Sequence, residues 1–167
     1  RSEVADQVKS MGGEFVPVDY VEEGAGVGGY AKVMSEGFQK AQREVFAKQA
    51  KEVDIIVTTA LIPGKPAPRL ITEEMVKSMK PGSVIVDMAA PAGGNCPLTE
   101  AGKTVGRYGV TIVGETNIPA LVAADSSSLY ARNVVDFLKL VITKDGTFNV
   151  PMDDDIVVAC LMTQGGE

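Results

Sequence analysis

The sequence contains no histidine among its 167 residues. These residues alone therefore cannot form a Ser-His-Asp or a Cys-His catalytic arrangement. The two cysteines, Cys96 and Cys160, lie far apart, and no histidine is present to complete a zinc or iron site with them. We therefore predict a reducing compartment and no bound metal.

Positive charge is also scarce, because 16 Lys and Arg face 22 Asp and Glu, which gives a net charge of -6. No basic surface is available to neutralise phosphates, so we expect no nucleic-acid partner. No apolar run approaches the roughly 18 to 20 residues that cross a bilayer, so we predict a soluble chain without direct membrane insertion. The charged start at residues 1–3 differs from a signal peptide, and a chain that begins with Arg and is at once helical indicates a fragment.

The apolar pattern predicts alternating helices and strands. Helical spacing indicates helices over residues 2–11 with Ser2 as cap, 34–50, 72–79, and 126–142 with Ser126 as cap. Apolar runs predict strands at 14–18, 54–58, 83–88 and 110–113. We interpret the segment before residue 110 as a polar connection and residues 117–124 as a turn with a short helical piece. The tail from Phe148 is interpreted as two possible strands on either side of Asp153–Asp155.

The predicted strands indicate the fold class. Residues 55–57 and 84–86 are continuously apolar, which is typical of a parallel sheet covered on both faces. We therefore predict a doubly wound, mostly parallel α/β sheet of Rossmann type, incomplete at its N-terminus. Residues 1–125 are the later part of a dinucleotide-binding domain, and residues 126–167 are a connecting helix and a return segment into a second domain. The apolar residues of that helix are core or interface: Leu129, Val134, Phe137, Leu138 and Val141.

Residues 24–29 match the letters G-x-G-x-x-G of a dinucleotide phosphate loop. We interpret them instead as a surface loop, either a plain linker or a mobile lid. A phosphate loop should follow its strand directly, whereas here Asp19, Glu22 and Glu23 intervene and would repel a pyrophosphate.

Two segments that follow predicted strands are better candidates for a ligand site, because ligands of such sheets lie beyond the carboxyl ends of strands. Residues 58–68 carry three prolines, and residues 89–96 carry paired glycines. Lys65 is interpreted as solvated rather than phosphate-binding. Cys96 is either a nucleophile or a small buried apolar residue, and we favour the second interpretation. Asp87 is either a polar site residue or the cap of a neighbouring turn.

Three segments together resemble the NAD(H)-binding component of proton-translocating nicotinamide nucleotide transhydrogenase, the alpha subunit in bacteria: residues 29–35, which begin G-Y-A-K, residues 58–68, and residues 93–96, which read G-G-N-C. The similarity covers residues 1 to about 140 and is shared in part with alanine dehydrogenase. Pro91 departs from the glutamate usual in the family, and nothing is carried over to the tail. The absence of histidine agrees with this chemistry, since hydride exchange between two nicotinamides needs no proton transfer in the chemical step.

The resemblance implies which residues meet the cofactor. Arg1 would follow the acidic group that grips the adenosine ribose. Gly29, Gln42 and Leu61 would contact NAD(H), and Thr59 and Ala60 would line its site. Tyr30 and Met34 would lie on a mobile loop that closes over the nucleotide. No catalytic residue is expected within this sequence.

The resemblance further implies hydride transfer from NADH to NADP on a partner domain, coupled to a membrane-embedded proton channel. It implies a homodimer at the cytoplasmic face of the bacterial inner membrane, or at the matrix face in mitochondria. Two alternatives stay open. One is an amino-acid dehydrogenase such as alanine dehydrogenase, and the other is a nucleotide-binding module without catalysis.

Overall fold

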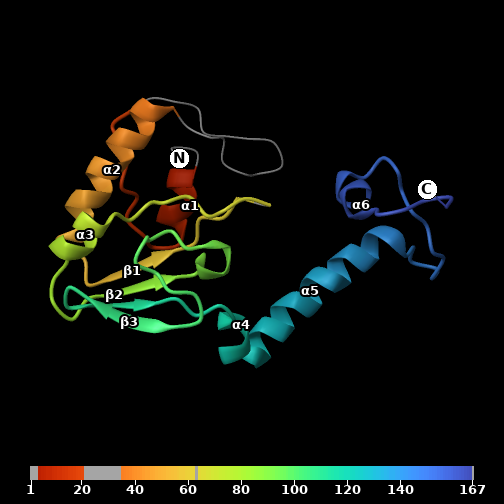
Figure 1. Cartoon of the computed structure of the whole chain (residues 1–167). Coiled ribbons are helices and arrows are strands. Elements are labelled where there is room, and N and C mark those ends of the chain that lie inside the picture. The colour runs from red at the N-terminus through yellow and green to blue at the C-terminus, as the bar shows by residue number, and fades with distance from the viewer. Residues whose placement is uncertain (1–3, 21–34, 63, 167) are drawn as a thin grey trace. The chain divides into compact units, whose positions relative to one another are not determined.

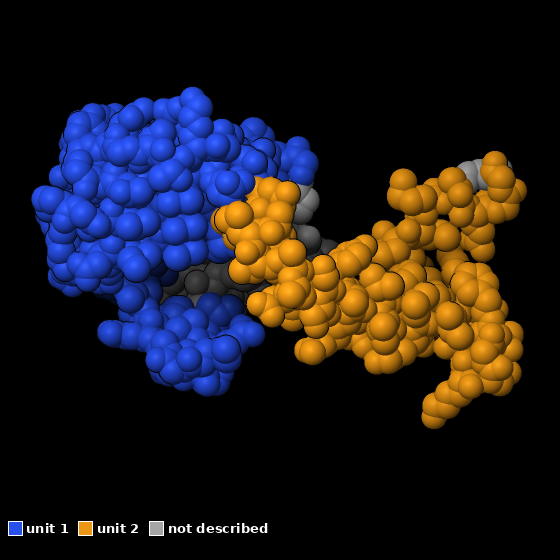
Figure 2. All heavy atoms as spheres, turned by 90° about the horizontal axis from the view of Figure 1, so that it is seen from below, with its two compact units in different colours: residues 1–116 blue, residues 117–167 orange. Residues whose placement is uncertain are grey.

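A computed structural model of the chain describes residues 4–20, 35–62 and 64–166. It contains two compact units, Arg1–Thr116 and Asn117–Glu167, shown in different colours in Figure 2. The first unit contains the described sheet, and the described elements of the second are helices. The domain boundary expected between residues 125 and 126 stays a prediction.

The sheet of the first unit has four strands in the order β1-β2-β4-β3. Their bounds are β1 Ile55–Thr58, β2 Val84–Asp87, β3 Thr104–Arg107 and β4 Val110–Val113. β1, β2 and β4 run parallel, and β3 runs antiparallel to β4. The prediction of a mostly parallel α/β fold is thereby confirmed.

The helices of the first unit are α1 Ala5–Ser10, α2 Glu36–Ala50, α3 Glu73–Ser78 and the 3-10 turn η3 Ala90–Ala92. Ser35 caps α2 and Thr72 caps α3, because each side chain accepts a hydrogen bond from a backbone N–H of the first turn. Glu73 and Glu74 add negative charge where the helix dipole of α3 favours it. The predicted helices 34–50 and 72–79 are therefore present within a few residues of their predicted bounds.

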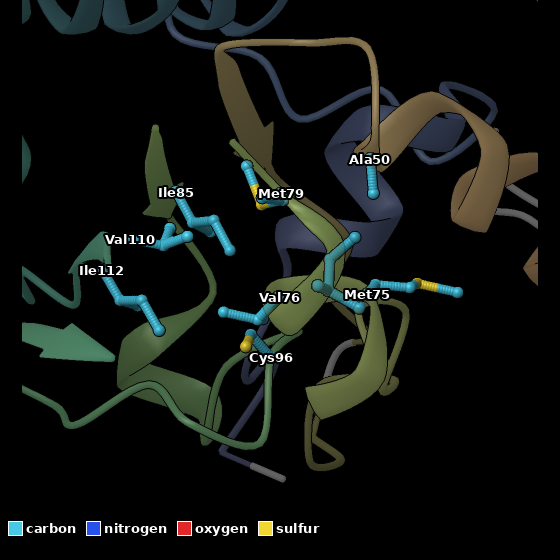
Figure 3. Close-up of a cluster of buried hydrophobic side chains, with 9 residues drawn as sticks. Ala50, Met75, Val76, Met79, Ile85, Cys96, Val110 and Ile112 are labelled. Atoms are coloured by element: carbon cyan, nitrogen blue, oxygen red, sulfur yellow. The ribbon is translucent and has the colours of Figure 1, made fainter. Parts of the chain in front are cut away.

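One face of the sheet carries the core (Figure 3). Ile85 and Ile112 project from neighbouring strands toward Val76 of α3, and all three side chains are fully buried. Ala50 at the end of α2 and Cys96 belong to the same cluster of buried residues. Burial of each aliphatic side chain of this size contributes about 1.5–3 kcal/mol, so this cluster fixes α2 and α3 on the sheet. Figure 1 shows both helices on the same side of the strands.

The other face of β1 is open. Ile55 and Val57 are 64% and 57% exposed, although their apolar run predicted burial. β1 is an edge strand of the sheet, and neither side chain belongs to the core cluster. Their neighbours in register on β2, Val84 and Val86, are half-buried.

Two strand predictions in the first unit are wrong. Residues 14–18 form no strand, because no described strand pairs with them and most of them are exposed. Residues 104–107, interpreted as a polar connection, form β3. The composition fits an edge strand, because Thr104, Gly106 and Arg107 are exposed and only Val105 packs against the core cluster. Tyr108 and Gly109 both have positive φ, 53° and 78°, and this two-residue turn returns the chain into β4.

The second unit consists of α4 Ile118–Leu121, α5 Ala123–Val141 and α6 Asp155–Cys160. Ser126 does not cap the long helix as predicted, because the helix begins three residues earlier, after Val122. The tail forms α6 in place of strands, since the Asp154 carboxylate accepts from two backbone N–H groups and starts a helix. Of the apolar residues on α5, only Val141 is buried, whereas Leu129 and Leu138 are exposed. No helix in the described part of the chain is both long and apolar enough for a membrane span.

Candidate ligand site at the carboxyl ends of β1 and β2

Thr58 and Asp87 are the last residues of β1 and β2 and are partners in the parallel register. The Thr58 hydroxyl donates a 3.0 Å hydrogen bond to the Asp87 carboxylate, and both side chains are buried. The segments that follow the two strands, which we call the proline loop (residues 59–68) and the glycine loop (residues 89–96), therefore start side by side. The two segments selected from the sequence as site candidates therefore leave the same edge of the sheet, and their role in binding a ligand stays a prediction.

Asp87 organises the glycine loop. Its side chain is 0% exposed and accepts five hydrogen bonds of 2.6–3.1 Å. The donors are the hydroxyls of Thr58 and Thr99 and the backbone N–H groups of Ala89, Asn95 and Cys96. A buried carboxylate is tolerated only when its oxygens are satisfied, and here donors from four parts of the chain satisfy them.

These contacts also set the charge of Asp87. Burial alone would raise its pKa, but the hydrogen bonds from Thr99, Asn95, Cys96 and Thr58 stabilise the ionised form and outweigh that effect. The pKa of Asp87 is therefore held below its usual range, and the carboxylate is an ionised anchor at neutral pH. Of the two interpretations of Asp87 from the sequence, the geometry supports the turn-organising one.

Asn95 joins the two loops. Its side chain is 0% exposed and reaches across to the proline loop. Its carboxamide oxygen accepts from the Ala60 N–H at 3.1 Å, and its Nδ2 donates to the Ala60 and Pro68 carbonyls at 2.9 and 2.8 Å. One buried amide thus satisfies both backbone groups of Ala60, as a neighbouring strand would.

The backbone of the glycine loop is held from a second side by Arg69. Its Nη1 donates to the carbonyls of Gly94 and Cys96 at 3.2 and 2.9 Å. Gly94 itself requires glycine, since its φ is +80° and a Cβ there would lie 2.6 Å from an Asp87 carboxylate oxygen. The paired glycines therefore permit a backbone approach to Asp87 that any side chain would block, as their pattern predicted.

A groove of about 360 Å³ runs along β1 and ends at the start of the proline loop. It is lined by Phe46, Gln49, Ala50, Val53, Ile55, Ile56, Val57, Thr58, Thr59, Ala60, Leu70 and Ile71. None of these side chains carries a charge, so the groove suits a flat, largely apolar group. Gly93 and Gly94 do not line it, and their loop acts on the groove through Asn95.

The structure brings together some of the predicted site residues. Thr59 and Ala60 line the end of the groove, and Leu61 follows directly with 53% of its surface exposed. Gln42 lies half-buried on α2, one turn before the groove residue Phe46, and does not line the groove. Arg1, Gly29 and Tyr30, together with Met34 and the G-x-G-x-x-G stretch at residues 24–29, lie outside the described residues.

The structure supports the non-functional interpretations of Cys96 and Lys65. Cys96 is 0% exposed within the core, and burial raises the pKa of its thiol, which disfavours the thiolate that a nucleophile needs. Lys65 is exposed in the proline loop. Within the described ranges, no group of three or more potential metal-ligating side chains comes together.

Sequence reasoning missed the three residues that hold the loops. Asn95 was noted only as a letter of G-G-N-C, and neither Arg69 nor Thr99 was selected. The available signal was a polar residue placed directly after paired glycines and before Cys96. That signal does not identify the partners of the side chain, which a buried amide acquires only in the folded structure.

Parallel strands with two loops at their carboxyl ends define a Rossmann-like α/β domain, the class in which ligands bind at that edge. The chain belongs to the family described as alanine dehydrogenase/PNT, C-terminal domain, whose model matches residues 1–167.

Three similar proteins illustrate the range of this family. The chain is 53% identical over 169 residues to the NAD(P) transhydrogenase subunit alpha of Haemophilus influenzae, covering 100% of this chain and 33% of that protein. It is 36% identical over 126 residues to an alanine dehydrogenase of Methanococcus maripaludis, covering 72% of this chain and 34% of that one. The crystal structure of transhydrogenase from Sinorhizobium meliloti matches with a TM-score of 0.63 and 41% identity, over 83% of this chain and 34% of that chain. The chain thus spans about a third of the length of each of these proteins.

Proposed function

We propose that this chain is the NAD(H)-binding part of a transhydrogenase that passes hydride from NADH to NADP⁺ on a separate domain, coupled to proton translocation. The observation that carries the proposal is the clamp of Asn95 on Ala60. These hydrogen bonds hold the start of the proline loop at the carboxyl edge of a parallel sheet. The chain that carries this site is 53% identical to an NAD(P) transhydrogenase alpha subunit.

The described residues fit one part of a nicotinamide dinucleotide. The uncharged groove of about 360 Å³ suits one ring of the cofactor rather than its pyrophosphate. Thr59, Ala60 and Leu61 would hold the cofactor at the end of the groove, and Gln42 would approach it from α2. Arg1, Gly29 and Tyr30 are proposed as further contacts on the basis of the family resemblance.

Bound NADH would supply the hydride. The residues of this chain would bind and orient the cofactor and exclude water from it, because hydride exchange between nicotinamides needs no acid or base in the chemical step. The role of the site is then positional, and the hydrogen bonds that fix the proline loop are what it requires.

The partners follow from the same proposal. A subunit of this kind would work with an NADP(H)-binding domain and a membrane-embedded proton-channel domain, as a homodimer. It would face the cytoplasm of a bacterium or the matrix of a mitochondrion. The support is that the relative from Haemophilus influenzae is named as one subunit of an NAD(P) transhydrogenase.

The test is a titration of the full-length subunit with NADH and, separately, with NADPH, followed by fluorescence. We expect saturable binding of NADH and at least about tenfold weaker binding of NADPH, a difference of about 1.4 kcal/mol. Absence of NADH binding by the folded subunit would overturn the proposal.

A second candidate is an alanine dehydrogenase, which the 36% identity to the enzyme of Methanococcus maripaludis supports. Oxidation of L-alanine with NAD⁺ by the full-length protein, without any NADP-binding partner, would establish it. Reduction of an NADP⁺ analogue by NADH, only when the partner is present, would instead establish the transhydrogenase. NADH binding without either activity would favour a module that binds the nucleotide and catalyses nothing.

A further inference from the structure

Asn95 is a buried polar side chain of the glycine loop, and its side-chain hydrogen bonds run to the proline loop beside it. Its carboxamide oxygen accepts from the Ala60 N–H, and its Nδ2 donates to the carbonyls of Ala60 and Pro68. These two residues stand near the start and at the end of the proline loop. Asn95 therefore fixes both the point where the loop leaves β1 and the point where it turns toward α3.

The backbone on both sides of Asn95 is itself held by several contacts. Its backbone N–H donates to Asp87 at 2.8 Å, and the carbonyls on either side of it accept from Arg69. The next residue, Cys96, is packed in the core cluster. A side chain anchored in this way transmits its position to whatever it holds, because its own rotation is blocked.

By contrast, the part of the proline loop that Asn95 holds has few other supports. Both backbone groups of Ala60 are hydrogen-bonded to Asn95, and the neighbouring side chains of Thr59 and Leu61 are exposed. Among the described residues, two further backbone hydrogen bonds hold the loop: the Ala67 N–H donates to the Ala92 carbonyl, and the Lys65 N–H donates to the Ile62 carbonyl. The position of residues 59–61 thus depends on Asn95.

Resting on the proposed function, we infer that Asn95 is a positioning residue for the dinucleotide site: it touches no cofactor and holds the Ala60 backbone where the cofactor binds. Substitution of a residue with this role changes the Kd for NADH and leaves the number of binding sites per folded chain unchanged. Substitution of a residue that merely stabilises the fold lowers the fraction of folded protein and leaves the Kd unchanged.

The experiment is calorimetric titration of the full-length subunit with NADH, in wild type, Asn95→Ala and Val110→Ala. Val110 is the matched control, because it is equally buried but begins β4, at the end of the sheet away from both loops. We expect Asn95→Ala to keep one site per folded chain and to raise the Kd for NADH about tenfold or more, since the backbone groups of Ala60 lose buried partners. We expect Val110→Ala to lower the fraction of active sites, if it lowers anything, with the Kd unchanged.

Asn95→Asp is the second variant to be titrated, and it replaces Asn95→Ala if the alanine variant does not fold. It has the same size and keeps an acceptor for the Ala60 N–H, but the ionised side chain lacks the donors that the Ala60 and Pro68 carbonyls require. A raised Kd in this variant supports the inference.

An unchanged Kd in folded Asn95→Ala or Asn95→Asp would overturn the inference while leaving the proposed function intact. An equal rise of the Kd in Val110→Ala would also overturn it. Wild type that does not bind NADH would instead overturn the proposed function, so the two failures are distinct.

Discussion

The two loops at the carboxyl edge of the sheet differ in what holds them. The end of the glycine loop is buried from Gly94 to Cys96, and its backbone is tied to Asp87 and Arg69. The start of the proline loop is exposed at Thr59 and Leu61 and is held through the Asn95 side chain. The glycine loop is thus the frame, and the proline loop is the surface that a ligand meets.

This difference shows where stability and binding separate in one small region. Changes in the frame should cost folding free energy, because they leave buried polar groups without partners, and Asn95 is the exception whose change should mainly alter ligand affinity. Changes on the exposed loop should leave the fold intact and alter ligand affinity. Each prediction below moves one of these quantities and leaves the other in place.

The largest effect is expected for Asp87→Ala. Removal of the carboxylate leaves five buried donors without their acceptor, so the free energy of unfolding should fall by about 3 to 5 kcal/mol. Urea unfolding followed by circular dichroism measures it. The control is Asp54→Ala. Asp54 lies directly before β1, and its exposed ion pair with Lys80 contributes less than about 1 kcal/mol. Equal losses in the two variants would show that Asp87 does not anchor the frame.

Leu61→Arg should weaken NADH binding without lowering the stability of the fold. The side chain is 53% exposed, so arginine is accommodated, but its length and charge would block an apolar site for the cofactor. We expect the Kd for NADH to rise about a hundredfold, near 2.7 kcal/mol, with an unchanged unfolding midpoint. Met11→Arg, at a position 85% exposed, is the matched control and should bind as wild type does. Wild-type affinity in Leu61→Arg would place the cofactor elsewhere.

The frame should also respond to acid. The folded-state pKa of Asp87 lies below its unfolded value of about 3.9, so its contribution to stability is complete above that pH and is lost as pH falls through the folded pKa. The free energy of unfolding of wild type should therefore decline below about pH 4 more steeply than that of Asp87→Asn. Parallel pH profiles for the two proteins would contradict the ionised anchor.

The smallest effect is expected for Cys96→Ala. The thiol is buried and its pKa is raised, so it contributes packing and no chemistry. The Kd for NADH and the rate of hydride transfer should stay within about twofold of wild type, although the protein loses some stability. Loss of hydride transfer with retained NADH affinity would instead give Cys96 a chemical role.

The sequence predicted the parts of the fold that periodicity controls. The helix that ends at Ala50 was recognisable from its apolar stripe, and the strands at 55–58 and 84–87 were recognisable from their continuous apolar runs. β3 was missed, because an edge strand carries polar residues on both sides and its turn uses Tyr108 where Asn is typical. The strand predicted at 14–18 was wrong, because composition does not reveal whether a partner strand is present.

The site was predictable only in part for a similar reason. The ligand-binding edge of the sheet could be predicted from strand ends that are followed by glycine or proline, because ligands of such sheets bind beyond the carboxyl ends of the strands. The clamp was not predictable, because Asn95 and Ala60 are 35 residues apart and meet only once β1 and β2 pair in register. Hydrogen bonds of this kind depend on tertiary geometry that no local pattern encodes.

Hydrogen exchange of the full-length subunit with and without NADH tests the central claim, that the exposed start of the proline loop meets the cofactor. We predict that NADH slows exchange in the peptide covering residues 59–62 and leaves β3 unchanged. Unaltered exchange in residues 59–62 at saturating NADH, together with protection elsewhere in the subunit, would contradict it.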